Sequence, residues 1–329
     1  MLKLLGISTA ILLLLAGCSA QEKGSADAGH PGASPAASGQ AAPVTPSAPA
    51  AASQSAVPND SAPVSTAIPA AVLDPAELTG SFGFADSSGK RILAASGDDS
   101  RLAEMKTLNT ALGNNGQVRR VKFEQWQPGS AGSNGRDMAN NFANLSGYVF
   151  TVEDGRAASD ETYYLASSAE FNRASLLALK PSADNPQQLG ANDPVRQQIL
   201  ALKQRDIQSA WKLADLSDRP EDLHLYVVQF VKQDKNLLFS LVLQKGPELS
   251  FMDYPAVVQD DESSGWRVDD GGEITPGMFS LLFAARTANG VLLGVNWWGA
   301  EGVNSFFLLQ QGAGFKEMDI SYGRYTSPL

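Results

Sequence analysis

The chain has 329 residues, of which 43% are hydrophobic and 18% charged, and its formal net charge is −10. This composition is sufficient for a large folded core and excludes a chain that is disordered throughout. The negative charge argues against a nucleic-acid partner, since phosphates are bound through Lys and Arg. One cysteine excludes an internal disulfide framework and a cysteine-based metal cluster, and only His30 and His224 are available for a histidine metal site or a catalytic triad.

The first residues have the pattern of a secretory signal. A positive start, Met1-Leu2-Lys3, precedes a short apolar run from Leu4 to Ala16. A spanning helix needs about 18 or more apolar residues, so this run is too short to be one. The run ends in Leu15-Ala16-Gly17-Cys18, which resembles the lipobox of bacterial lipoproteins: a leucine, two small residues and the cysteine.

This resemblance implies that residues 1–17 are a lipoprotein signal peptide and that cleavage after Gly17 leaves a lipidated Cys18, with palmitate among its acyl chains. The protein is then extracytoplasmic, and a membrane is its first partner. In cells with two membranes, the family's sorting pattern retains lipoproteins with Asp after the cysteine in the inner membrane. Ser19 in that position therefore implies the outer membrane. In a single-membrane cell the anchor lies in the outer face of the cytoplasmic membrane. The alternative is an ordinary secretory signal followed by an unmodified cysteine.

Residues 18–71 are predicted to be a disordered tether. Of the 53 residues from 19 to 71, 38 are Ala, Ser, Pro or Gly, and none is aromatic. Such a segment buries too little apolar surface to offset the entropy of ordering it. His30 lies within it and is interpreted as a solvated linker residue. The globular part is therefore expected to span 72–329, as one domain or as two lobes, 72–217 and 218–329.

The first half of the globular part is predicted to mix helices and strands. Periodicity favours helices at 101–112, where Leu102, Met105, Leu108 and Leu112 share a face, and at 193–216, which Asp193 can cap. Alternation predicts a strand at 118–126 with one wet face. The segments 147–152 and 162–166 are predicted to be a pair of strands around Glu153-Asp154-Gly155.

The second half is predicted to form antiparallel strands. The segments 223–231 and 237–243 flank a polar loop, and 278–286, 291–298, 303–311 and 315–322 follow with Gly-containing connections. Asn289-Gly290 is a strong hairpin signal. The run 237–243 is apolar on both faces, which predicts a covering element, expected to be a helix. The predicted fold class is therefore α+β, with a C-terminal antiparallel β-meander covered by helix.

Common catalytic motifs are missing from the sequence. It contains no GxSxG, HExxH, GxxxxGK[ST] or EF-hand loop. His224 begins an apolar strand and is interpreted as a residue at the edge of the core. We therefore assign no catalytic residue.

An acidic stretch from Glu248 to Glu273 is the most unusual feature of the globular part. Its eight carboxylates face one base, Arg267, and belong to Glu248, Asp253, Asp260, Asp261, Glu262, Asp269, Asp270 and Glu273. The favoured interpretation is a solvated region at loop tips, because unpaired charges are costly to bury. Three alternatives stay open: a Ca²⁺ site at Asp260, Asp261, Glu262, Asp269 and Asp270, contact with a basic or cell-wall partner, and a carboxylate pair for glycoside hydrolysis.

Trp297 and Trp298 end a predicted strand, so their side chains should point to opposite faces. Tryptophan beside a turn can contact a sugar ring or a protein partner. The two residues are therefore candidate contacts for a ligand or partner. The general expectation for such residues is that both side chains pack in the core.

These observations predict a membrane-anchored envelope lipoprotein whose soluble domain binds or supports an envelope protein or polysaccharide without catalysis. One alternative is a carboxylate-dependent envelope hydrolase, with or without Ca²⁺, which requires two carboxylates converging in an aromatic cleft. Another is a solute-binding receptor, which requires two α/β lobes with parallel strands. No cofactor other than the lipid on Cys18 is expected.

Overall fold

The computed structural model describes residues 71–183, 185–218, 221–258 and 264–328. The lipobox with Cys18, the predicted tether up to residue 70, and Asp260, Asp261 and Glu262 lie outside the described residues. The described residues belong to one compact unit. Strands dominate this unit, and its two α-helices are short, so the α+β prediction is wrong.

Six strands form a closed barrel in the order β1-β2-β5-β4-β3-β6. They are β1 (Ser81–Ala85), β2 (Arg91–Ala95), β3 (Thr110–Gly113), β4 (Gln117–Pro128), β5 (Ser146–Val152) and β6 (Thr162–Ala166). All ladders in this barrel are antiparallel. One core of the barrel contains Ile92, Val121, Tyr148, Phe150 and Tyr163. The segments 147–152 and 162–166 are strands as predicted, but β5 pairs with β2 and β4 while β6 pairs with β1 and β3, so their predicted pairing is wrong.

Nine strands form a second sheet in the order β12-β13-β14-β15-β11-β10-β9-β8-β7. They are β7 (Ala178–Pro181), β8 (Ile207–Asp218), β9 (Glu221–Phe230), β10 (Asn236–Lys245), β11 (Glu248–Val257), β12 (Phe279–Thr287), β13 (Gly290–Trp298), β14 (Gly302–Gln311) and β15 (Gly314–Tyr325). The predicted strands at 223–231, 237–243, 278–286, 291–298, 303–311 and 315–322 are confirmed, and no end differs by more than three residues.

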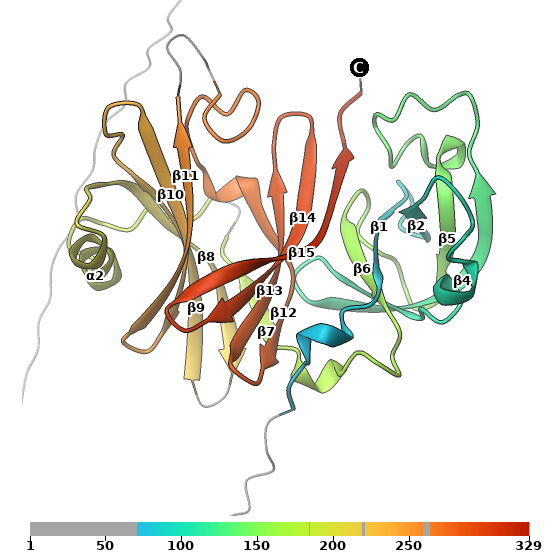
Figure 1. The fold of residues 1–329 in the computed structure, drawn as a ribbon, viewed down its shortest axis with the longest axis horizontal. Helices are drawn as coiled ribbons and strands as arrows, with labels where there is room; N and C mark the ends of the chain where they lie inside the picture. The colour runs from blue at the N-terminus through green and yellow to red at the C-terminus, as the bar shows by residue number, and fades with distance from the viewer. Residues whose placement is uncertain (1–70, 184, 219–220, 259–263, 329) are drawn as a thin grey trace, which may run out of the picture. The chain divides into compact units, whose positions relative to one another are not determined.

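The nine-stranded sheet curls so that its two halves face each other (Figure 1). One apolar cluster joins Leu225, Val227 and Leu241 of the first half to Leu281 and Leu293 of the second. We call the face that carries this cluster the inner face. The apolar run of β10 is thus covered on its inner side by the other half of the same sheet, whereas the predicted covering helix packs only on its outer side.

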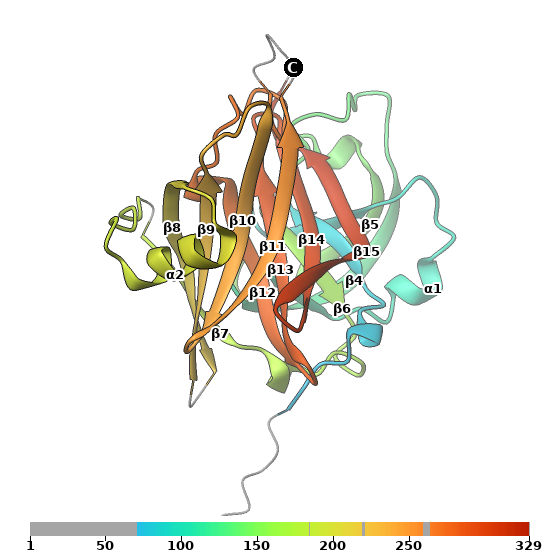
Figure 2. The same ribbon diagram turned by 60° about the vertical axis from the view of Figure 1, so that its left-hand side comes forward.

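The outer face of the sheet has two different covers. Leu282, Phe283 and Phe307 of the second half pack with Phe82 and Tyr164 of the barrel. Helix α2 (Pro194–Lys203) lies over the outer face of the first half, where its Ile199 is buried in a cluster that includes Val228, Phe230 and Val242 (Figure 2).

Helix α2 ends much earlier than its sequence pattern predicts. Asp193 caps its N-terminus by accepting from the backbone N–H groups of Val195 and Arg196, as expected. Gln204, with φ 49°, adopts the left-handed conformation that ends the helix, and β8 begins at Ile207. The predicted helix 193–216 is therefore wrong beyond Lys203. Helical spacing predicts that Leu202 shares the apolar face of Val195 and Ile199, but its side chain is 59% exposed.

The predicted helix 101–112 is also mostly wrong. Helix α1 covers only Leu102–Met105, and Thr110–Gly113 is the strand β3. Leu112 belongs to the interface between barrel and sheet, whereas Met105 and Leu108 lie in the barrel core. Four short 3₁₀ turns complete the fold, at Pro75–Glu77, Phe142–Asn144, Arg173–Ser175 and Pro276–Met278. Neither α-helix in the described residues has the length and hydropathy of a membrane span.

Strand β11 lies within the acidic stretch, where no strand is predicted from the sequence. It pairs with β10 over ten residue pairs but with β15 only at Phe251 and Gly314, so most of its second edge has no ladder partner among the described residues. The backbone N–H of Phe251 points to this second edge, since it donates to Ala313. Pro255 lies at the same edge, four residues after Phe251. Proline has no N–H donor, and this part of the edge needs none because it has no described ladder partner there.

Candidate functional site

The two ends of the curled sheet meet at a seam between β7 and β12. The backbone N–H of Leu177 donates to the carbonyl oxygen of Ala284 at 2.9 Å, and Leu176 forms an antiparallel bridge with Ala285. Further along, after Pro181, side chains line the seam, and a cavity of about 240 Å³ opens between the two ends. We call it the seam cavity.

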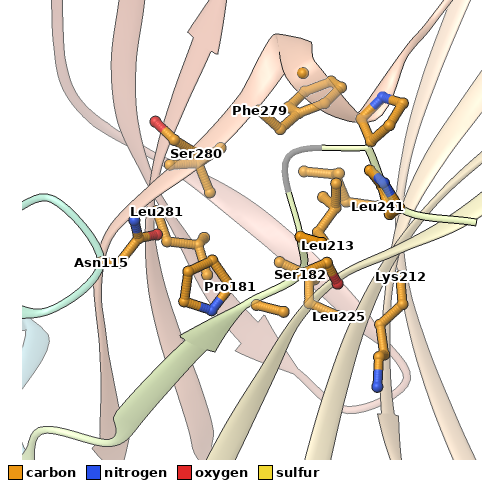
Figure 3. A pocket seen from close by; sticks show the side chains of 16 residues that line it. Asn115, Pro181, Ser182, Lys212, Leu213, Leu225, Leu241, Phe279, Ser280 and Leu281 are labelled. Atoms are coloured by element: carbon orange, nitrogen blue, oxygen red, sulfur yellow. The ribbon is translucent and has the colours of Figure 1, made fainter.

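Apolar side chains from both halves of the sheet surround the seam cavity (Figure 3). Its apolar walls are formed by Pro181, Ala183, Pro186, Leu213, Ala214, Leu225, Leu241, Pro276, Phe279, Leu281 and Val295. Leu225 and Leu241 belong to the inner-face cluster, so the cavity is a recess in the apolar interior of the curled sheet. This is the chemistry of a small-molecule pocket, in which a mostly apolar wall carries a few polar groups.

A β-bulge shapes the wall of the cavity. The β8–β9 ladder shifts register between Lys212 and Ala214, which leaves Leu213 as the extra residue of β8. A bulge re-aims side chains at the place where it occurs. Ala214 joins the inner-face cluster opposite Leu225, whereas Lys212 lies opposite Tyr226, which faces the outer side.

The charge of Lys212 is held away from the cavity. Its Nζ lies 2.9 and 3.1 Å from the two carboxylate oxygens of Asp215, and Asp215 Oδ1 lies 2.6 Å from Nδ1 of His224. Figure 3 shows the amine directed away from the other lining side chains. Burial opposes ionisation of Asp215, but hydrogen bonds with Lys212 and His224 lower its pKa below the ordinary value. His224 thus belongs to a hydrogen-bonded polar cluster on the outer face.

Three uncharged polar side chains lie at the cavity: Asn115, Ser182 and Ser280. The turn between β3 and β4 brings Asn115 there, because the N–H groups of Asn115 and Gly116 donate to the carbonyl oxygens of Leu281 and Leu282 at 2.7 and 2.8 Å. Ser280 Oγ already accepts hydrogen bonds, from Asn296 Nδ2 at 3.2 Å and Trp298 Nε1 at 3.1 Å.

An aromatic cluster continues from the cavity wall into the interior. Phe279 stacks on Trp297, and Trp297 packs edge-on against Phe239 with ring centroids 5.2 Å apart. Tyr254 stacks on Phe239 at 4.7 Å. Trp297 Nε1 and the Tyr254 hydroxyl are buried without a hydrogen-bond partner among the described residues. Burial, followed by the charge of Glu317, raises the pKa of Tyr254 far above its ordinary value.

The two tryptophans do not form a joint platform. Trp297 lies on the inner face, in the aromatic cluster described above. Trp298 Nε1 donates to Ser280 Oγ, and the guanidinium carbon of Arg324 lies 5.9 Å from its ring centroid. Adjacent strand residues point to opposite faces, which separates their environments.

The described carboxylates of the acidic stretch have separate surroundings. Asp270 accepts four backbone N–H bonds, from Gly265, Trp266, Arg267 and Gly272, at 2.6–2.9 Å. These bonds lower its pKa although burial acts to raise it. Asp253 is bonded to Lys203 and Ser240. Glu248, Asp269 and Glu273 are exposed. Within the described ranges, no three His, Cys, Asp or Glu side chains are grouped to hold a metal ion.

No local sequence pattern predicts the seam cavity. Its lining comes from segments more than 150 residues apart, from Asn115 to Val295, and no local motif marks them. The inward leucines of the strands are readable from alternation, but the closure of the sheet is not. No protein-family model, curated protein or solved structure matches this chain.

Proposed function

We propose that this protein is a cell-envelope lipoprotein, anchored through Cys18, whose folded domain binds a small, neutral and mainly apolar ligand without catalysis. The observation that supports it is the seam cavity, with its wall of aliphatic and Phe side chains. The anchor rests on the lipobox resemblance of Leu15 to Cys18.

The size of the cavity restricts the ligand. A dry apolar cavity of about 150 Å³ holds benzene, so about 240 Å³ accommodates a substituted aromatic ring or a short acyl chain. Asn115 and Ser182 offer hydrogen bonds to a polar head such as a hydroxyl or an amide. Lys212 is engaged by Asp215, so none of the described residues that line the cavity offers a free cation to a carboxylate.

The hydrolase and receptor alternatives find less support. A carboxylate hydrolase needs two carboxylates in one cleft, whereas Asp253 and Asp270 are each bonded to their own local partners. A two-lobed receptor needs parallel α/β layers, whereas the ladders here are antiparallel except between β11 and β15.

Calorimetric titration of the purified full-length protein with toluene, octan-1-ol and N-acetylglucosamine tests the proposal. We expect the two apolar compounds to bind, with a negative heat-capacity change from apolar burial, and the sugar not to bind. A Leu213→Trp variant, which fills the cavity, should lose binding. Leu202→Trp, on the exposed side of α2, is the matched control and should retain it. Absence of toluene and octanol binding, or equal binding by the Leu213→Trp protein, contradicts the proposal.

A further inference from the structure

A second concave surface lies at the other side of the aromatic cluster, between β11, the loop 264–275 and the β13–β14 turn. Its volume is about 670 Å³, and its walls include Val257, Trp266, Val268, Gly299 and Tyr325. We call it the upper groove. It shares no residue with the seam cavity.

Exposed apolar side chains gather at the upper groove. Six large hydrophobic side chains of the described residues are conspicuously exposed, and three of them line this one groove: Val257 at 65%, Val268 at 66% and Tyr325 at 48%. Scattered single apolar residues are normal on a surface, but a group around a concavity marks an interaction site.

Among the described residues that line the groove, one cation has no ion pair. Glu301 pairs with Arg136 at 3.2 Å, and Arg324 pairs with Asp160. Arg267 has no ion pair with any described carboxylate. The charge of Asp270 acts on Arg267, but both carboxylate oxygens of Asp270 accept the four backbone N–H bonds of the loop.

The guanidinium of Arg267 is also held in place. It packs over Gly299, where an added Cβ would lie 2.3 Å from Nε, and it faces the Trp297 ring at 5.6 Å from the centroid. Its one hydrogen bond among the described residues is from Nη2 to the Gly302 carbonyl oxygen at 3.3 Å. The group is half-buried, so a carboxylate bound there is less screened than at a free surface. A fixed planar guanidinium suits bidentate binding of a carboxylate.

We propose that the upper groove binds the C-terminal residue of a partner peptide, with its carboxylate on Arg267 and its apolar side chain against Val257, Val268 and Tyr325. An internal acidic side chain has a polar backbone on both sides, whereas a C-terminal residue presents an apolar side chain and a carboxylate together. Gly299, Gly302 and Gly323 line the groove without side chains, which leaves room for a peptide backbone.

The test compares acetyl-Ala-Ala-Phe as the free acid with the same peptide as its C-terminal amide, by calorimetry on the full-length protein. We expect the acid to bind at least about tenfold more tightly, as a charge-assisted hydrogen-bond pair implies. Because this comparison uses the unmodified protein, it does not depend on any variant folding. Equal affinity of acid and amide, or no binding of the acid, overturns the proposal.

Two pairs of variants locate the site. Arg267→Gln should abolish the preference for the acid, and Val268→Ser should weaken both peptides, whereas the exposed Arg173→Gln and Val231→Ser proteins should behave as wild type. The cavity-filling Leu213→Trp variant should leave peptide binding unchanged, which separates this proposal from that for the seam cavity. An Arg267→Gln protein that folds and keeps its preference for the acid contradicts the assignment.

Discussion

Arg324, near the end of β15, donates a hydrogen bond to Asp160, just before β6, and so ties the nine-stranded sheet to the barrel. The Nη1–Oδ1 distance is 2.5 Å, and the Arg324 side chain is fully buried while that of Asp160 is 38% exposed. The guanidinium also bonds the Asp160 carbonyl oxygen and the Thr162 hydroxyl, and it faces the Phe84 ring at 5.2 Å. A buried charge held this way depends strongly on its partner.

Asp160→Asn should lower the free energy of unfolding by about 2–4 kcal/mol, because it removes the carboxylate that is ion-paired with the buried Arg324. Asn tolerates the left-handed conformation of this position, where φ is 58°, so the backbone should not add to the loss. Asp154→Asn is the matched control, since its partner Arg120 is 68% exposed, and it should cost less than about 1 kcal/mol. Urea unfolding measures both, and equal losses would contradict the role of the Arg324–Asp160 pair.

Glu161 should make stability depend on pH. Burial, together with the neighbouring Asp160, raises its pKa to about 7 although Arg324 acts to lower it. The folded protein therefore holds this proton more tightly than the unfolded chain. The free energy of unfolding should fall as pH rises from about 4.5 to about 7, by up to about 3 kcal/mol, and this group should cause no further loss at higher pH.

Glu161→Gln removes this dependence, so the variant should gain stability relative to wild type across that pH range. Glu153→Gln, at an exposed position next to β5, is the control and should follow the wild-type curve. Denaturation curves at pH 4.5, 6 and 7.5 measure the free energy of unfolding of the wild-type protein and of both variants. Parallel wild-type and Glu161→Gln curves would be incompatible with a buried Glu161 of raised pKa.

Asp270 should contribute to stability through its four backbone hydrogen bonds. Asp270→Ala removes the acceptor for four N–H groups of the loop, so we expect a loss of about 1–3 kcal/mol in the free energy of unfolding. Asp269→Ala, at the exposed neighbour, should cost less than about 1 kcal/mol. Thermal melts should not shift between EDTA and millimolar Ca²⁺. A rise of several degrees with Ca²⁺ that disappears in an Asp269→Asn, Asp270→Asn protein would instead favour a metal site.

Cys18→Ser should block lipidation, because no other thiol exists in the chain. Stable anchoring requires more than one acyl chain, so an unacylated protein should leave the membrane fraction or remain unprocessed. Fractionation and mass spectrometry of the N-terminus measure both effects. A variant that is processed normally and stays with the membrane would disprove the anchor at Cys18.

The strands of the second half could be predicted because their signals are local. Asn289-Gly290 joins β12 to β13 as a hairpin, and the polar loop 232–235 joins β9 to β10. Strand β11 was missed because its acidic residues and Pro255 are typical of loops. Pairing with β10 makes this segment a strand. Its second edge is largely unpaired among the described residues, so Asp253 can face solvent and Pro255 needs no N–H donor.

The errors in the helices have a different cause. The leucines around residues 102–112 fit a helical period by chance, although Leu112 belongs to β3 and faces another core. Residues 207–216 continue the apolar pattern of α2, but pairing with β9 makes them a strand. Tertiary pairing outweighs local propensity in both segments. The seam cavity depends on the curling of the whole sheet, which no local pattern encodes.

The most direct test of the proposed function is to locate the bound ligand. Methyl-labelled protein titrated with toluene should show saturable chemical-shift changes at Leu213, Leu225, Leu241 and Val295, four of the residues whose methyl groups line the seam cavity. The methyl groups of Leu202 and Val231, exposed elsewhere, should not respond. If the cavity methyls stay unchanged while toluene saturates, or if the exposed methyls shift instead, the seam cavity is not a binding site and the proposed function fails.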